Sequence, residues 1–141
     1  MGQKVNPKIF RLGTIYNWSS RWFDDKKYKD IVLSDFKLRR LLMEKLKNAG
    51  VSEIQIERSI NSIKFLIFVS RPGMVIGRGG TGLEELKQFL QNFLKKSPSL
   101  GGKAQKFDIR VEVEPVKEPN LDAYLVAKNI SDQLIKRLPQ K

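Results

Sequence analysis

The sequence contains no cysteine and no histidine among its 141 residues. Without cysteine the chain can form neither a disulfide nor a thiolate metal site, and a reducing compartment is expected. Without histidine it lacks the commonest general base, the usual partner of a nucleophilic serine and the commonest metal ligand. We therefore expect no enzyme, no catalytic residue and no metal site.

Long apolar segments are also missing. No run approaches the roughly 20 apolar residues that a membrane-spanning helix needs, and the opening MGQKVNP lacks the apolar stretch of a signal peptide. These features predict no membrane partner.

Positive charge is what the chain has in excess. It has 27 Lys and Arg residues against 15 Asp and Glu, which gives a net charge of +12. Such an excess favours binding to a polyanion, because cationic side chains release the counterions condensed on phosphates. The charge therefore predicts a nucleic-acid partner, and a basic protein without a special partner is the alternative.

Residues 1–30 interleave basic and aromatic side chains without a helical or strand period, and they contain both tryptophans, Trp18 and Trp22. Phosphates suit the basic residues and unstacked bases suit the rings. Two interpretations of this arm are open: its aromatic residues dock it onto the core, or it contacts RNA directly.

Hydrophobic periodicity over residues 31–141 predicts a single α+β domain that ends in a helix. Helices are expected at about 34–48, with Ser34 as N-cap, from about Leu83, and from about 120 or 122. A hairpin that turns at Asn61-Ser62 and a strand over 107–114 supply the strands. The economical architecture is a three-stranded sheet with helices on one face, plus the irregular basic arm.

A glycine-rich run, Gly77-Arg78-Gly79-Gly80-Thr81-Gly82, lies between strand and helix. A phosphate loop of nucleotide hydrolases would need Lys and Ser or Thr after the last glycine, where Leu83-Glu84 stand. The dinucleotide fingerprint is matched formally, but it should begin where a strand ends, whereas residues 72–76 intervene. No nucleotide cofactor, and no other cofactor, is expected.

A third interpretation of this run is an RNA clamp. A short helical turn, a Gly-x-x-Gly turn and a longer helix let backbone amides approach a sugar-phosphate strand. The alternative is a plain interhelical turn that needs glycine for positive φ, but three glycines within four residues exceed what we expect of such a turn. The predicted RNA-binding residues are Gly77, Arg78, Gly79 and Gly80.

Residues 75–80, Val-Ile-Gly-Arg-Gly-Gly, resemble the Val-Ile-Gly-x-x-Gly signature of K-homology domains, and the order of elements resembles their type II arrangement. Essentially the whole chain is similar to the family of the third protein of the small ribosomal subunit, of bacterial or organellar type, in its amino-terminal half. The similarity rests on these segments: residues 2–7, Arg11-Leu12-Gly13, 18–23, Ser34-Asp35-Phe36, Arg71-Pro72-Gly73 and Leu121-Asp122-Ala123.

The resemblance implies a structural constituent of the small-subunit head that binds ribosomal RNA and neighbouring head proteins. It implies a place near the path by which messenger RNA enters, on a cytoplasmic or organellar ribosome. It also implies that the arm lies against ribosomal RNA, although Trp22 could simply dock the arm. The arm residues added to the RNA-binding set are Gln3, Lys4, Asn6, Arg11, Arg21 and Trp22.

The chain departs from the family pattern at two places. Many relatives carry two basic residues inside the glycine loop, and here the second position is Gly79. The family also continues into a second domain with a basic cluster after the last helix, and we expect that domain to be absent here. A role in handling messenger RNA is therefore not carried over.

Two other functions are open from the sequence. The same fold could serve a free-standing regulatory or ribosome-assembly factor that binds single-stranded RNA. An enzyme acting on RNA would need carboxylates and a metal, but the adjacent Glu84 and Glu85 would diverge by about 100° on a helix and could not easily share an ion.

Overall fold

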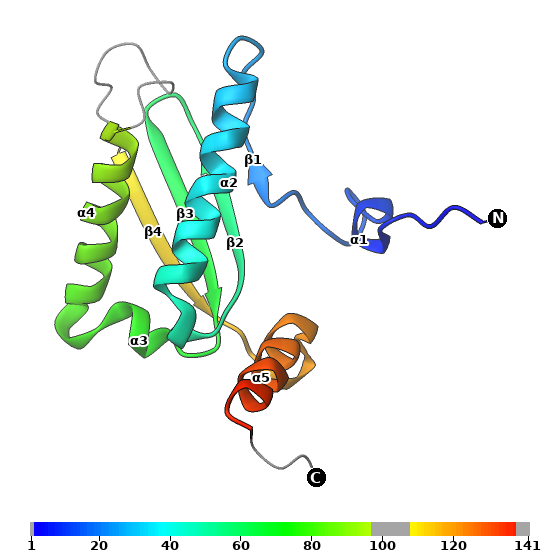
Figure 1. Ribbon diagram of the computed structural model, residues 1–141. Coiled ribbons are helices and arrows are strands. Elements are labelled where there is room, and N and C mark those ends of the chain that lie inside the picture. The colour runs from blue at the N-terminus through cyan, green and yellow to red at the C-terminus, as the bar shows by residue number, and fades with distance from the viewer. Residues whose placement is uncertain (1, 97–107, 138–141) are drawn as a thin grey trace.

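The computed structural model describes residues 2–96 and 108–137 (Figure 1). Single 3-10 turns cover Lys47–Ala49, Arg78–Gly80 and Pro119–Leu121. The helices and strands, in chain order, are α1 Pro7–Phe10, β1 Ser20–Arg21, α2 Tyr28–Lys45, β2 Val51–Arg58, β3 Ser62–Val69, α3 Pro72–Ile76, α4 Thr81–Lys96, β4 Asp108–Pro115 and α5 Ala123–Ile135.

The sheet is mixed, in the order β1-β2-β3-β4. Strands β2 and β3 form the expected antiparallel hairpin, and β4 lies parallel to β3 with Ile63 opposite Ile109. The fourth strand, β1, comes from the arm and pairs parallel with β2, with Ser20 opposite Ile56. Sequence periodicity does not predict β1, because two residues are too few to show alternation.

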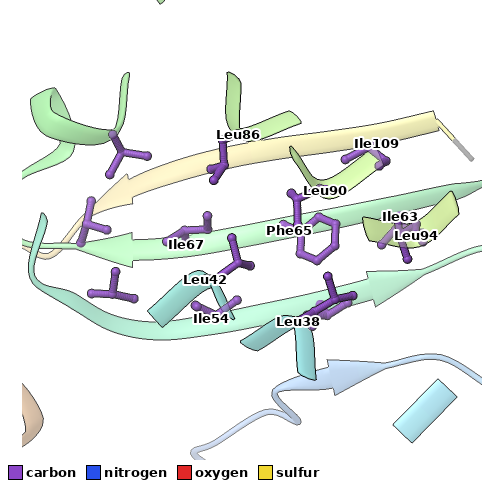
Figure 2. Close-up of a cluster of buried hydrophobic side chains, with 14 of the residues drawn as sticks. Leu38, Leu42, Ile54, Ile63, Phe65, Ile67, Leu86, Leu90, Leu94 and Ile109 are labelled. Atoms are coloured by element: carbon purple, nitrogen blue, oxygen red, sulfur yellow. The ribbon is translucent and has the colours of Figure 1, made fainter. Parts of the chain in front are cut away.

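Helices α2 and α4 cover one face of the sheet, and the core lies between them and the strands (Figure 2). Strand β3 buries every second side chain, because successive side chains of a strand point to opposite faces of the sheet. Each fully buried aliphatic or aromatic side chain stabilises the fold by roughly 1.5–3 kcal/mol. The buried apolar side chains that the two helices and β3 contribute are Ile31, Leu38, Leu42, Ile63, Phe65, Ile67, Val69, Leu86, Leu90 and Leu94.

The start of α2 corrects one prediction. The helix begins at Tyr28, six residues before the expected start and within the segment assigned to the arm. Ser34 is buried inside the helix and accepts a hydrogen bond from Arg58 Nη2 at 3.2 Å, so it is not the N-cap. The apolar period is hidden because a buried position of this helix holds a carboxylate, Asp35.

The other boundaries lie close to expectation. Gly50 adopts a left-handed conformation, φ 66°, after the turn that follows α2. Helix α4 begins at Thr81, two residues before the expected Leu83. Phe107, the expected first residue of the last strand, lies outside the described residues, as do residues 138–141.

Helix α5 lies beyond the end of the sheet (Figure 1). Asp122 caps its first turn by accepting hydrogen bonds from the amides of Tyr124 and Leu125 at 2.9 and 3.1 Å. Of the apolar side that the sequence predicts, Val126, Ile130 and Leu134 are exposed. No helix in residues 2–96 and 108–137 is long and apolar enough to cross a membrane.

Candidate nucleic-acid interface

The glycine loop joins α3 to α4. Helix α3 begins at Pro72, whose fixed φ suits the first helical position, and ends where the Gly77 amide donates to the Gly73 carbonyl at 3.0 Å. Gly77, Gly79 and Gly80 all have positive φ, at 71°, 63° and 84°. A turn of this shape therefore needs all three glycines, so their number alone does not indicate a ligand.

The glycines differ in what surrounds them. A Cβ on Gly77 would lie 2.9 Å from the Gly82 amide nitrogen, and one on Gly82 would lie 2.5 Å from the Val75 carbonyl oxygen. These two glycines therefore let α3 and α4 approach each other. A Cβ on Gly79 or Gly80 would meet no atom within 4 Å. The outer side of the turn is consequently bare backbone, open to an incoming strand.

The electrostatics of the loop favour an anion. The loop immediately precedes α4, a helix of 16 residues whose amino-terminal end carries positive partial charge. Arg78 is exposed, and within the described residues no carboxylate pairs with it. Glu84 in the first turn of α4 offsets part of this charge. Exposed amides beside one arginine can bind a phosphodiester oxygen.

The first part of the arm is exposed. Gln3, Lys4, Asn6 and Arg11 all point into solvent, and α1 has no buried residue. The Asn6 side chain caps α1 by accepting a hydrogen bond from the Lys8 amide at 2.9 Å, and Arg11 Nη1 donates to the Pro7 carbonyl at 3.1 Å. These contacts shape the arm locally and leave Lys4 and Arg11 accessible to a partner.

The second part of the arm is docked on the domain. Arg21 Nη2 forms an ion pair with Glu57 Oε1 at 2.6 Å, which compensates its charge. Trp22 is half-buried, and its Nε1 donates to Asp35 Oδ2 at 2.9 Å. Its ring lies 5.3 Å from that of Tyr28 between centroids. For Trp22, docking is thus the interaction that the structure shows.

The predicted site residues are divided between two regions. The arm leaves the domain at the β1 edge of the sheet, whereas α4 packs near β4 at the opposite edge (Figure 1). The glycine loop and the exposed arm residues therefore do not form one pocket. An RNA that touches both must span the domain.

The open face of the sheet carries little unbalanced charge. Lys64 Nζ lies 2.8 Å from Glu112 Oε2, and Arg110 Nε lies 3.2 Å from Asp108 Oδ2. Such mutual neutralisation lowers the attraction of this face for a polyanion. The excess cations of the chain are therefore displayed elsewhere.

The structure also brings together basic residues that sequence reasoning missed. A groove of about 870 Å³ lies between α5, α3 and the turn before β2, and it includes one acidic residue, Asp132. No local cluster in the sequence indicates this groove, because its cations are spread over some 90 positions and only the fold joins them. They are Lys47, Arg71, Lys128 and Lys136.

The acidic residues of the described part of the chain do not gather into a candidate metal site. No group of three or more His, Cys, Asp or Glu residues there could hold a metal ion. Glu84 and Glu85 are both exposed on α4 and form no such group.

Comparison with known proteins agrees with this geometry. Residues 37–121 match the KH domain family, a span that contains the hairpin, the glycine loop, α4 and β4. The arm and α5 lie outside that match. The order helix, two strands, two helices and strand over α2 to β4 is the type II arrangement.

Longer similarities include the arm and α5. The chain is 48% identical over 139 residues to small ribosomal subunit protein uS3 of Caldicellulosiruptor bescii, which covers 98% of the chain and 58% of that protein. The uS3 proteins of Desulfosudis oleivorans and Lactobacillus acidophilus are 44% and 43% identical, covering 98% of the chain and 60% and 57% of each relative. The chain thus spans less than two thirds of these relatives. It belongs to the KH domain family, and nearly all of it is similar to uS3, in the portion that contains the amino-terminal KH domain.

Proposed function

We propose that this protein is a structural constituent of the small ribosomal subunit head, where it binds ribosomal RNA and performs no catalysis. The observation that carries the proposal is the exposed turn at Gly79-Gly80, at the positive end of α4, where a Cβ on either residue would meet no atom within 4 Å. The printed name of its relatives, small ribosomal subunit protein, supports the assignment to that subunit.

In this proposal the RNA backbone is held at two places. Amides of the turn beyond Gly77, whose own amide is bonded to the Gly73 carbonyl, donate to phosphate oxygens of one stretch, and Arg78 adds a charge-assisted contact. Gln3, Lys4, Asn6 and Arg11 contact a second stretch. Arg21 and Trp22 contact RNA only with the parts of their side chains that docking leaves exposed, since both are tied to the domain.

The remaining partners follow from the same assignment. We propose contacts with neighbouring proteins of the subunit head, and a place near the path by which messenger RNA enters. The site of action is the ribosome, in the cytoplasm or in an organelle.

A pair of isosteric loop variants tests the proposal. The double variant Gly79→Asp/Gly80→Asp places two carboxylates against phosphates, whereas Gly79→Asn/Gly80→Asn imposes similar backbone strain without charge. Strain at each left-handed position costs about 1 kcal/mol, and Asp and Asn tolerate it alike. We expect the Asp variant to bind a small-subunit ribosomal RNA fragment much more weakly than the Asn variant at equal thermal stability. Equal affinities of the two variants would contradict the clamp.

Sedimentation distinguishes an integral constituent from a free-standing RNA-binding factor. The protein should remain with small subunits during sedimentation in high salt, because an integral constituent is held by many simultaneous contacts. Complete release under conditions that retain other head proteins would favour the free-standing factor.

A further inference from the structure

A buried carboxylate joins the arm to the domain. Asp35 of α2 is only 2% exposed, and both oxygens of its carboxylate accept hydrogen bonds from other side chains. Arg58 of β2 donates to Oδ1 through Nε at 2.8 Å and also through Nη2. Trp22 Nε1 and Ser20 Oγ, both from the arm, donate to Oδ2 at 2.9 and 3.1 Å.

The two oxygens of Asp35 thus serve different segments. Oδ1 is paired with Arg58 inside the domain, and Oδ2 accepts hydrogen bonds from the arm. A buried carboxylate is strongly destabilising unless it is paired and hydrogen-bonded. Without the arm, Oδ2 would lose both of these partners, so the carboxylate favours the docked position of the arm.

Arg39 reinforces the same junction from the next turn of α2. Its Nε donates to the Ile54 carbonyl at 3.2 Å, and its Nη2 donates to the Ser19 carbonyl at 2.9 Å and to the Ser20 hydroxyl. The side chains of α2 therefore fix the arm at residues 19–22. The two residue pairs of β1 alone are a short ladder for holding a segment of this length.

Upstream of this junction the arm has little else to hold it. Among the described residues, the ion pair that links this part of the arm to the domain joins Lys8 Nζ to Glu53 Oε2 at 3.9 Å, and the two side chains are 64% and 36% exposed. An exposed pair of that kind contributes little to order. The direction in which Lys4 and Arg11 leave the domain therefore depends mainly on the Asp35 junction.

We propose that Asp35 is a positioning residue for RNA recognition. It does not touch RNA, since it is buried, but it sets the course of the arm so that Lys4 and Arg11 meet the RNA that the glycine loop holds. This inference rests on the proposed function. The arm binds RNA more tightly because its path is already fixed in the free protein. A free arm would have to be ordered on binding, which costs conformational entropy.

The test compares two charge-removing variants of the same helix. Asp35→Asn leaves one acceptor oxygen, which cannot serve both Arg58 and Trp22. Asp30→Asn, one and a half turns earlier, removes the same charge and no hydrogen bond of the described network. Both are made in a Trp18→Phe background, so that the indole N–H signal in an NMR spectrum belongs to Trp22 alone.

We expect Asp35→Asn to shift the Trp22 indole signal and to speed its exchange with solvent. Affinity for a small-subunit ribosomal RNA fragment should fall about tenfold at moderate salt, and the slope of log K against log salt should drop by roughly 1.5, as for two lost phosphate contacts. Asp30→Asn removes the same charge, so it should leave the Trp22 indole signal in place and should not lower the affinity or the salt slope. A shifted indole signal with unchanged affinity and slope would overturn the proposal.

Trp22→Phe keeps the test decisive if Asp35→Asn fails to fold. This variant retains a ring that could stack on a base but removes the donor to Oδ2, and it should lower affinity in the same direction. Unchanged affinity would again overturn the proposal. If the parent protein itself does not bind the RNA, the proposed function fails first, and the indole signal of Asp35→Asn still reports whether the junction docks the arm.

Discussion

Four glycines of the loop lie within six residues but differ in what surrounds them, and they therefore differ in what they contribute. Gly77 and Gly82 stand where two helices approach, and Gly79 and Gly80 stand on the open side of the turn. Substitutions at the first pair should therefore act on stability through steric clash, and those at the second pair should act on binding, with only the strain of a left-handed backbone added. The distinction follows from surroundings that no sequence pattern displays.

Replacing Gly82 with Ala should destabilise the protein by about 1–3 kcal/mol, because the added methyl meets the backbone carbonyl of Val75, which cannot move freely. Gly73→Ala is the matched control, since a Cβ there meets nothing within 4 Å and alanine suits a helix. Free energies of unfolding from denaturant titration measure both. A Gly82→Ala protein as stable as Gly73→Ala would refute the close approach.

Replacing Arg78 with Ala should weaken binding to ribosomal RNA and lower the slope of log K against log salt by about 0.7–0.9, the value for one phosphate contact. Lys64→Ala removes a cation that is already paired with Glu112 on the open sheet face, so its slope should remain that of the parent. Salt titrations of both variants check this. A larger loss of affinity for Lys64→Ala than for Arg78→Ala would mean that the RNA binds the open sheet face and not the glycine loop.

For single residues, exposure can be predicted from the sequence more reliably than contact partners can. The position of Gly79, Gly80 and Arg78 on an exposed loop follows from the motif. The docking of Arg21 on Glu57 and of Trp22 on Asp35 does not, because each contact joins residues 13 or more positions apart through the fold.

At the scale of elements, α5 depends on its cap. Burial raises the pKa of Asp122, but the Ser52 hydroxyl, the amides of Leu125 and Tyr124 and the nearby Lys8 ammonium outweigh this effect and hold the pKa below its ordinary value of 3.8. The ionised carboxylate therefore stabilises the folded state above that value. This contribution is lost as the pH falls through the lower folded-state pKa.

Replacing Asp122 with Ala should cost about 1 kcal/mol at neutral pH, the usual loss for a helix cap. The free-energy difference between parent and variant should shrink as the pH falls from about 5 to about 2, since protonation removes the same interactions. Chemical denaturation across this range measures it. A difference that grows toward low pH would contradict the lowered pKa.

Elements with a strong apolar period are predicted well, and elements held by polar contacts are not. The hairpin, α4 and β4 follow from alternation or from a helical stripe. The first two turns of α2 escape prediction because polar Ser34 and Asp35 fill the buried positions between Ile31 and Leu38. Strand β1 escapes it because two residues are too few to show alternation. A polar junction leaves no hydrophobic period to detect.

At the scale of the whole molecule, the net charge of +12 is unevenly displayed. Acidic side chains pair with cations on the open sheet face, whereas the arm and the glycine loop keep exposed cations. Charge alone predicts a polyanionic partner, and the fold adds which surfaces keep exposed cations. The distance between arm and loop could not be foreseen, since the edge position of β1 is set by long-range pairing.

The most direct test of RNA binding by the glycine loop and the arm is an NMR map of backbone amide shifts on addition of a small-subunit ribosomal RNA fragment. We expect the largest shifts at residues 77–80 and at residues 3–11, with the amide signals of Lys64, Arg110 and Glu112 unchanged. Shifts concentrated on that open sheet face, with no change at residues 77–80, would contradict binding of RNA by the glycine loop.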